Sequence, residues 1–293
     1  LLYSFSQAER KIHVQIKSTI LQSSIQIIGI VICFFYFQSN IYAVISVLAL
    51  SYFIAILYFL FQENTYQLLI DKNLFQSFDT QLSRAVIFYG LPVCLWFFAS
   101  QFYVVGDRIL FKYFKVVENV SNYAAFRDLS VGLSSIITMP LLMASHPLIM
   151  KLSKLNNETF EIENLISNNI KLLITLFTPV FIAIFLIGED FLELVIGKKY
   201  LLDTIFMFLV LVTIFFATVS MYLHKGLETK GKTILMAKIA ICVAFTSLVL
   251  NFLLIPIYGV FAAIFVALLS QILYSSFVYF FSRKVYRISI PII

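Results

Sequence analysis

Charge is scarce in this chain. Asp, Glu, Lys and Arg make up only 12% of the 293 residues, about half of their share in an average soluble protein. Hydrophobic residues reach 61%, with 32 phenylalanines, and the mean hydropathy is +0.96. A soluble core of this length cannot bury so much apolar surface, so the composition predicts a membrane protein.

Cysteine is also scarce and is not arranged for chemistry. Cys33, Cys94 and Cys242 lie in three separate apolar runs. They form no CxxC pair and have no metal-type spacing with the three histidines. We expect the thiols to be buried apolar filler and the histidines to be interface residues rather than metal ligands.

Sequence motifs of enzymes are missing as well. The chain has no P-loop, no HExxH, no GxSxG and no pair of acidic residues in a long loop. The gaps between apolar runs are too short for an external catalytic domain. We therefore expect no catalytic residues, no cofactor and no metal.

Basic residues are in excess, and their placement excludes nucleic acid as a partner. The formal net charge is +6, but membrane proteins are commonly basic because their cytoplasmic loops collect Lys and Arg. No basic cluster is interleaved with aromatic residues as in nucleic-acid-binding proteins. We expect membrane lipids as partners and no nucleic acid.

Long apolar runs dominate what is present. A membrane-spanning helix needs about 20 apolar residues, and eight runs approach this length. They predict an all-α, polytopic membrane protein with about eight transmembrane helices at residues 19–38, 41–61, 85–105, 122–145, 170–188, 204–223, 234–254 and 258–281.

Lys and Arg residues concentrate in alternate gaps between these runs. Fifteen of them lie on the side of the two chain ends and five on the opposite side. Under the positive-inside rule this bias predicts a cytoplasmic C-terminus. The hairpins around Asn40 and Tyr258, which contain no basic residue, are then expected on the outer side.

One cytoplasmic gap has a helical pattern of its own. Apolar residues alternate there with Glu158, Glu161 and Glu163 before the fifth run begins. The pattern predicts a short amphipathic helix that lies on the membrane surface and leads into the fifth span.

Arg127 is the one basic residue that belongs to no gap. On a helix of 3.6 residues per turn it shares a face with Ser130, Ser134 and Thr138. A polar stripe in a membrane must face protein or water, so we predict a hydrated cavity with a cation for an anionic substrate group. Alternatively, Arg127 extends to the outer interface and the hydroxyl groups bond to their own helix.

Three other polar residues are candidates for function. Asp128 and Asn251 are candidates for ion coupling, although Asp128 could instead pair with a neighbouring helix. Arg108, next to Asp107 at the end of the third run, either caps that helix at the interface or lines the mouth of the same cavity. Polar residues of other runs could line a pathway or join helices, namely Ser18, Gln22, Gln26, Thr246, Ser247, Gln271 and Ser275.

Five segments, in order along the chain, resemble a family of transporters. Residues 92–114, with Asp107-Arg108, look like the seventh helix of bacterial polysaccharide flippases. Val120-Ser-Asn-Tyr-Ala-Ala-Phe-Arg127 is similar to the opening of the eighth helix in that family, although Ser121 replaces a glycine. Pro147-Leu-Ile-Met-Lys-Leu resembles the exit from the eighth helix.

The last two segments lie further along. Ile196-Gly-Lys-Lys-Tyr200 looks like the Phe-Gly-x-x-Tyr turn of the family, and residues 250–259 resemble its Asn-x-x-Leu-Ile-Pro-x-Tyr-Gly hairpin. Ala262 and Ile264 depart from the small pair expected after the hairpin. The chain thus resembles the O-antigen repeat-unit flippases of the multidrug/oligosaccharidyl-lipid/polysaccharide exporter superfamily, well over 84–293 and loosely over 1–83.

The resemblance implies a twelve-helix transporter with two six-helix lobes. Residues 1–83 would supply the last two helices of an N-terminal lobe and the inter-lobe loop, and 84–293 the complete C-terminal lobe, so we expect the first four helices to be missing. The implied function is to flip an undecaprenyl-pyrophosphate-linked oligosaccharide across the bacterial inner membrane. A polysaccharide polymerase and a chain-length regulator are the implied protein partners.

Two alternatives remain open from the sequence. A transporter of the same fold could export drugs or the peptidoglycan lipid precursor, and a membrane polysaccharide polymerase or acyltransferase would belong to a different class. In the flippase interpretation Arg127 is the first candidate for binding the pyrophosphate and Arg108 the second, because guanidinium groups suit phosphate oxygens.

Overall fold

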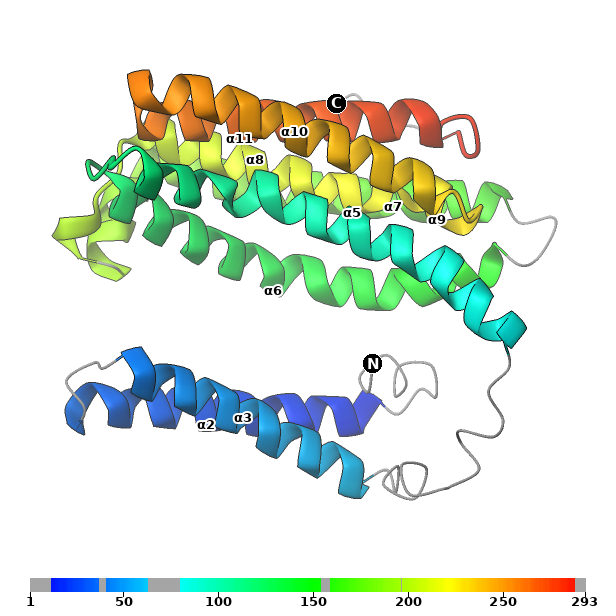
Figure 1. The fold of residues 1–293 in the computed structure, drawn as a ribbon, viewed down its shortest axis with the longest axis horizontal. Helices are drawn as coiled ribbons and strands as arrows, with labels where there is room; N and C mark the ends of the chain where they lie inside the picture. The colour runs from blue at the N-terminus through cyan, green and yellow to red at the C-terminus, as the bar shows by residue number, and fades with distance from the viewer. Residues whose placement is uncertain (1–11, 37–40, 63–79, 154–158, 196, 288–293) are drawn as a thin grey trace. The chain divides into compact units, whose positions relative to one another are not determined.

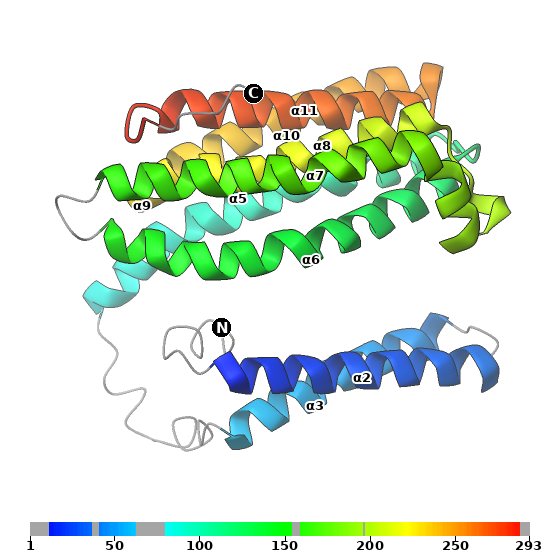
Figure 2. The same ribbon diagram turned by 180° about the vertical axis from the view of Figure 1, so that it is seen from behind.

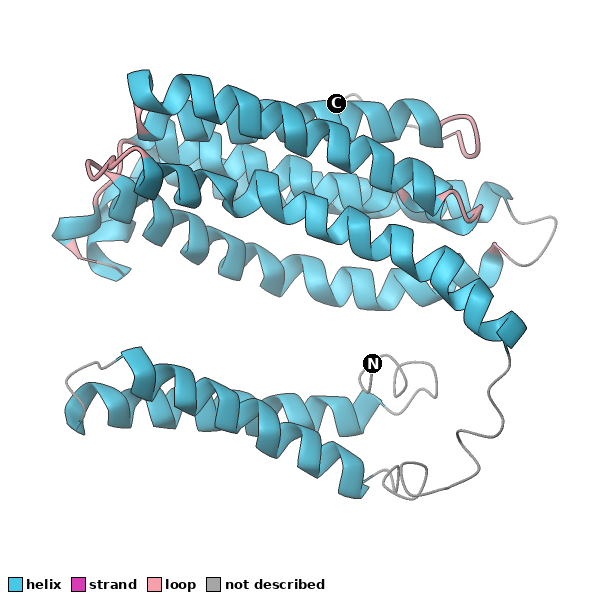
Figure 3. Cartoon of the chain, in the orientation of Figure 1, coloured by secondary structure: helices cyan, strands magenta, loops and turns pink. Residues whose placement is uncertain are grey.

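The computed structural model describes residues 12–36, 41–62, 80–153, 159–195 and 197–287. Within these residues the chain forms helices and connecting turns and no strand (Figure 3). The predicted all-α fold class is therefore confirmed.

Eight of the described helices are long and apolar enough to cross a membrane. The chain is a multi-pass membrane protein, as its apolar runs predict. These helices are α2 (Ile12–Tyr36), α3 (Ile41–Gln62), α5 (Thr80–Tyr113), α6 (Val120–Leu152), α7 (Thr159–Val195), α8 (Thr204–Leu223), α10 (Thr233–Tyr258) and α11 (Val260–Ser282). Two short helices complete the set, η2 (Lys198–Tyr200) and α9 (Lys225–Thr229).

Three of the long helices extend well beyond their predicted runs. Helices α5, α6 and α7 have 34, 33 and 37 residues, whereas about 20 residues cross the hydrocarbon core. Backbone hydrogen bonding continues after the apolar run ends, so hydropathy alone underestimates these helices. Prolines within them do not end them, namely Pro92, Pro140, Pro147 and Pro179.

The expected amphipathic surface helix is instead the first part of α7. Helix α7 runs without a break from Thr159 into the membrane-spanning part. Ile162, Ile166 and Ile170 on its apolar face are 2%, 0% and 1% exposed and belong to the protein core. The predicted helix that leads into the fifth span is therefore present, but its apolar face packs against protein, and its position at the membrane surface stays a prediction.

The cysteines differ from expectation in a similar way. Cys33 is buried, as predicted, but Cys94 and Cys242 are exposed on the surfaces of α5 and α10. In a membrane protein an apolar surface position faces lipid, so a cysteine there needs no place in the core.

The chain divides into two compact units, Leu1–Ser83 and Arg84–Ile293. In the first unit α2 and α3 form a hairpin joined by polar contacts. Ser18 Oγ donates a hydrogen bond to the Ala55 carbonyl at 3.3 Å, and Gln26 Nε2 donates to Ser51 Oγ at 3.1 Å. These side chains therefore hold the two helices together, which is one of the two roles expected from the sequence.

The second unit contains six long helices, α5, α6, α7, α8, α10 and α11, which form a bundle (Figures 1 and 2). Helices α10 and α11, α8 and α11, and α7 and α8 pack closely against each other. Helix α5 joins this core through large side chains. The Trp96 Nε1 donates to the Tyr274 hydroxyl at 2.5 Å, and the rings of Phe111 and Tyr123 meet edge to face at 6.2 Å.

A single glycine makes the tight connection between α10 and α11. Gly259 ends one helix and caps the next with φ of +57°, a conformation that side chains with a Cβ rarely adopt. The hairpin expected around Tyr258 is therefore present, whereas the one around Asn40 lies outside the described residues.

We predict that the α10–α11 hairpin is on the outer side of the membrane. A Tyr258→Cys variant, in a background without native cysteines, should react with a membrane-impermeant thiol reagent applied to intact spheroplasts. Lys230→Cys, before the other end of α10, is the matched control and should react only after permeabilisation. The reverse labelling pattern would contradict the predicted orientation.

Candidate functional site

Two charged dipeptides in opposite order meet near one end of the second unit. Asp107-Arg108 lies close to the end of α5, and Arg127-Asp128 lies about two turns, roughly 10 Å, into α6. The two helices are consecutive and run in opposite directions, and the opposite charges pair crosswise. The first residue of one dipeptide bonds to the first residue of the other, and the second to the second. Arg127 Nη1 lies 2.9 Å from Asp107 Oδ2, and Arg108 Nη2 bonds to Asp128 Oδ1. We call these four residues the crossed pairs.

Tyr123 closes a ring of hydrogen bonds around the first pair. Its hydroxyl donates to Asp107 Oδ2 at 2.7 Å and accepts a hydrogen bond from Arg127 Nη1, also at 2.7 Å. The second oxygen of Asp107 accepts from the Arg108 backbone N–H at 2.8 Å. The Asp107 carboxylate is thus satisfied by three donors, as a buried charge requires.

The two pairs differ in exposure. The side chains of Arg127 and Asp107 are 9% and 5% exposed, whereas those of Arg108 and Asp128 are 35% and 63% exposed. Removing one partner of a buried pair costs about 3–5 kcal/mol, while an exposed pair contributes about 0–1 kcal/mol. The hydrogen bond to Asp128 raises the pKa of Arg108, so this guanidinium stays charged. The more exposed pair, Arg108 with Asp128, is consequently the one in which a ligand can replace a partner more easily.

Sequence reasoning identifies Arg127 but misses its partners. It presents Arg127 as an unpaired cation, whereas the structure neutralises it with Asp107 and adds the hydroxyl of Tyr123. Of the two roles considered for Asp128, pairing with a neighbouring helix is the one seen. The opposite order of the two dipeptides, on consecutive helices, is the signal in the sequence that indicates these pairings.

Arg127 also lines a small cavity between α6, α8 and α11. The cavity has a volume of about 70 Å³, and Tyr123, Arg127, Thr213 and Gln271 are the polar residues that line it. It has room for a few water molecules or one small polar group. Among the described residues, both hydrogen bonds of Arg127 come from Nη1, and the buried Oε1 of Gln271 has no partner. Donors and an acceptor therefore remain available at this cavity.

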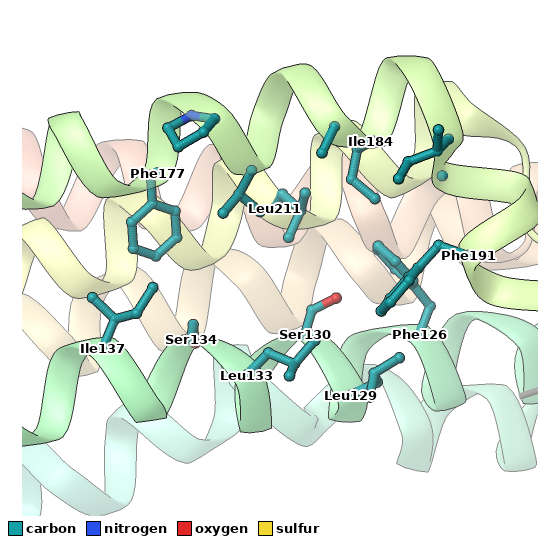
Figure 4. Close-up of a pocket in the computed structure, with 15 residues that line it drawn as sticks. Phe126, Leu129, Ser130, Leu133, Ser134, Ile137, Phe177, Ile184, Phe191 and Leu211 are labelled. Carbon is teal, nitrogen blue, oxygen red and sulfur yellow. The ribbon is translucent and has the colours of Figure 1, made fainter. Parts of the chain in front are cut away.

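A larger groove of about 410 Å³ lies between α6 and α7, with one residue from α8. Figure 4 shows side chains of both helices pointing into it, and Ser130 and Ser134 are the only hydroxyl-bearing residues of the fifteen that line it. Ser134 Oγ bonds to the Val131 carbonyl of its own helix at 2.9 Å. We call this space the α6–α7 groove.

The groove is not the hydrated cavity that the helical pattern predicts. Leu129, Leu133 and Ile137, which are not members of the predicted polar stripe, line the same groove (Figure 4). The groove is wide enough for these three apolar residues and the two serines to line it together. Its lining is consequently apolar, and Arg127 is not among the residues that form it.

The other predicted site residues lie apart from both cavities. Thr138 is 6% exposed within α6, and Asn251 is 3% exposed within α10. Asn251 Nδ2 donates to Ser247 Oγ at 3.4 Å, and its buried Oδ1 has no partner among the described residues. The structure thus brings together Arg108, Arg127 and Asp128 but leaves Thr138 and Asn251 elsewhere.

Across the described ranges, no group of three or more His, Cys, Asp or Glu side chains is placed to hold a metal ion.

These features define a multi-pass α-helical membrane protein with a buried, paired arginine near one end of its larger unit. A family model described as "polysaccharide biosynthesis protein" matches residues 1–153, just over half of the chain. The chain therefore belongs to this family, and the resemblance to polysaccharide flippases is confirmed. The matched range contains the crossed pairs and Pro147, whereas residues 196–200 and 250–259 lie outside it. No curated protein and no solved structure matches the chain.

We predict that Tyr123→Phe destabilises the second unit. The change removes a donor from the buried Asp107 and an acceptor from Arg127, which should lower the free energy of unfolding by about 1–3 kcal/mol. Thermal unfolding in detergent measures the loss. Tyr103→Phe is the control, since Tyr103 is similarly buried and its hydroxyl makes no hydrogen bond within the described residues. Equal effects of the two variants would contradict the role assigned to Tyr123.

Proposed function

We propose that the protein takes part in flipping an undecaprenyl-pyrophosphate-linked oligosaccharide repeat unit from the inner to the outer leaflet, for O-antigen or capsule synthesis. The observation that carries the proposal is Arg127, an arginine 7% exposed within a membrane-spanning helix of a polysaccharide biosynthesis family member. Ionisable residues at such positions are costly and commonly functional. The protein acts as a transporter rather than an enzyme.

The crossed pairs can exchange one anion for another. They hold two arginines and two aspartates, so the network is neutral as it stands. A diphosphate group could replace the exposed Asp128 carboxylate on Arg108, because little free energy is lost with that pair. The Nε atom of Arg108 is buried without a partner among the described residues and would supply a further donor. Arg127 would then provide a second guanidinium.

The parts of the substrate suit different surfaces of α6. Sugar hydroxyls and phosphate oxygens need polar partners, which the crossed pairs provide. Ser130 and Ser134 would add two hydroxyl groups at the α6–α7 groove. The α6–α7 groove has an apolar lining that suits the lipid part better than the sugars. Released carboxylates would be free to bind an ion, so Asp128 remains the first candidate for ion coupling and Asn251, with its unpaired Oδ1, the second.

We also propose the membrane, the orientation and the protein partners of the chain. The unit Arg84–Ile293 contains six of the eight candidate spans and would form the C-terminal lobe of a two-lobe transporter in the bacterial inner membrane. The C-terminus would be cytoplasmic. A polysaccharide polymerase and a chain-length regulator would use the translocated repeat unit.

Transport can be measured directly in proteoliposomes. The full-length protein is reconstituted with a fluorescent lipid-linked oligosaccharide, and an impermeant quencher reports how much of it reaches the outer leaflet. Arg108→Gln and Arg127→Lys should each slow flipping about tenfold or more, because hydrogen bonds to charged groups are worth about 1.5–3 kcal/mol. Arg127→Lys keeps the charge next to Asp107, so folding should be preserved while the planar fork is lost.

A control variant and the possible outcomes distinguish the flippase proposal from the assignment of its site residues. Arg283→Gln, an exposed arginine without an ion pair among the described residues, should flip at the wild-type rate. If the inner-leaflet substrate stays protected from the quencher in the presence of wild-type protein, the flippase proposal is refuted. A new covalent bond in the substrate would instead favour an enzyme. Wild-type rates for both variants would refute only the assigned site.

A further inference from the structure

A second polar network lies near the other end of the six-helix unit and is not used by the proposed site. Lys225 Nζ lies 2.8 Å from His146 Nδ1 and donates to Glu228 Oε2 at 2.6 Å. Lys225 is only 6% exposed, although sequence reasoning counts it with the lysines of a cytoplasmic gap. The network connects α6, which carries His146, to α9, which carries Lys225 and Glu228.

The protonation state of His146 follows from the chemistry of its partner. A lysine ammonium group can only donate hydrogen bonds, and its 2.6 Å contact with Glu228 is that of a charged pair. The Nδ1 atom of His146 must therefore accept, so it carries no proton, and the neutral imidazole has its proton on Nε2. A second proton on Nδ1 would set two donors and two positive charges 2.8 Å apart.

The remaining charged and titratable groups around His146 come from four elements, α5, α8, α9 and α11. Glu228 Oε1 lies 3.8 Å from His146 Nε2, which favours a positive imidazole but exceeds hydrogen-bond length. His224, at the end of α8, lies 3.8 Å from the same carboxylate, and its buried Nδ1 has no partner among the described residues. Tyr89 of α5 and Tyr274 of α11 act electrostatically on Glu228. Lys225 is the basic group in contact with His146.

Access and flexibility both favour His146 as the group that responds to protons. Its side chain is 40% exposed, whereas those of Lys225, His224 and Glu228 are 7%, 6% and 17% exposed. Pro140 and Pro147 lie on either side of it within α6, and each removes a helix hydrogen bond. The neighbouring polar contact between α6 and α8, from Ser145 to Tyr222, is long at 3.4 Å.

We propose that His146 is a proton-binding site, and that proton binding detaches the C-terminal end of α6 from α9 by breaking the His146–Lys225 hydrogen bond. Lys225 then keeps Glu228 as its partner, so no buried charge is left unpaired. The inference goes beyond the proposed function and requires nothing about the substrate.

Histidine-selective NMR tests the binding site. The full chain has three histidines, so ¹⁵N-labelled imidazole signals can be assigned with His146→Gln and His224→Gln variants. At about pH 8 the His146 signal should show an unprotonated Nδ1, and it should convert to imidazolium as the pH falls toward about 5, a range that brackets the ordinary histidine pKa of about 6.5. A His146 that stays neutral throughout, or is doubly protonated at pH 8, would overturn the proposal.

Pulsed electron resonance tests the detachment. Spin labels at Lys151→Cys on α6 and Lys230→Cys after α9, both exposed positions, report the distance between the two ends in a background without native cysteines. In the otherwise native protein the population at longer distance should rise several-fold between pH 8 and pH 5. His146→Gln, which keeps an acceptor but cannot be protonated, should abolish this rise, whereas His224→Gln should retain it. The same rise in His146→Gln, or none in the native protein, would contradict the detachment.

Discussion

The ion pair between Asp107 and Arg127 is the interaction on which the rest of the second unit depends. An unpaired charge inside an apolar helix bundle costs several kcal/mol, so Arg127 can occupy α6 only if a carboxylate reaches it. Asp107 does so from α5, with Tyr123 completing the hydrogen bonds at 2.7 Å. This pairing fixes the adjacent ends of α5 and α6 and brings Arg108 to Asp128 as a consequence.

Helix α6 is held by polar contacts near both ends and packs loosely between them. The crossed pairs hold its beginning, the His146–Lys225 hydrogen bond holds its end, and the α6–α7 groove takes up about 410 Å³ of the space between. Its neighbours are packed more closely, α10 against α11 and α8 against α11. The proposed transport would require an element that can move against a rigid frame, and α6 has the contacts expected of such an element.

The apolar runs predict the number and order of the spans, because burial in lipid acts on each helix separately. Contacts between helices could not be predicted in the same way, because they depend on which helices become neighbours. Arg127 is conspicuous in the sequence as a lone charge, yet its partner Asp107 lies twenty residues earlier and reads as an interfacial cap. Likewise, the three isoleucines of α7 from Ile162 to Ile170 face protein rather than the membrane surface, because neighbouring helices cover them. Lys225 resembles any loop lysine until the fold encloses it.

The most direct test of this account is a double-mutant cycle on the buried pair. Asp107→Asn and Arg127→Gln, made singly and together, are compared by the free energy of unfolding of the full protein in detergent. Each single change leaves one buried charge without its partner and should cost about 3–5 kcal/mol, whereas the double variant should cost clearly less than the sum. Strict additivity of the two single losses would show that the residues do not interact and would contradict the central role of the pair.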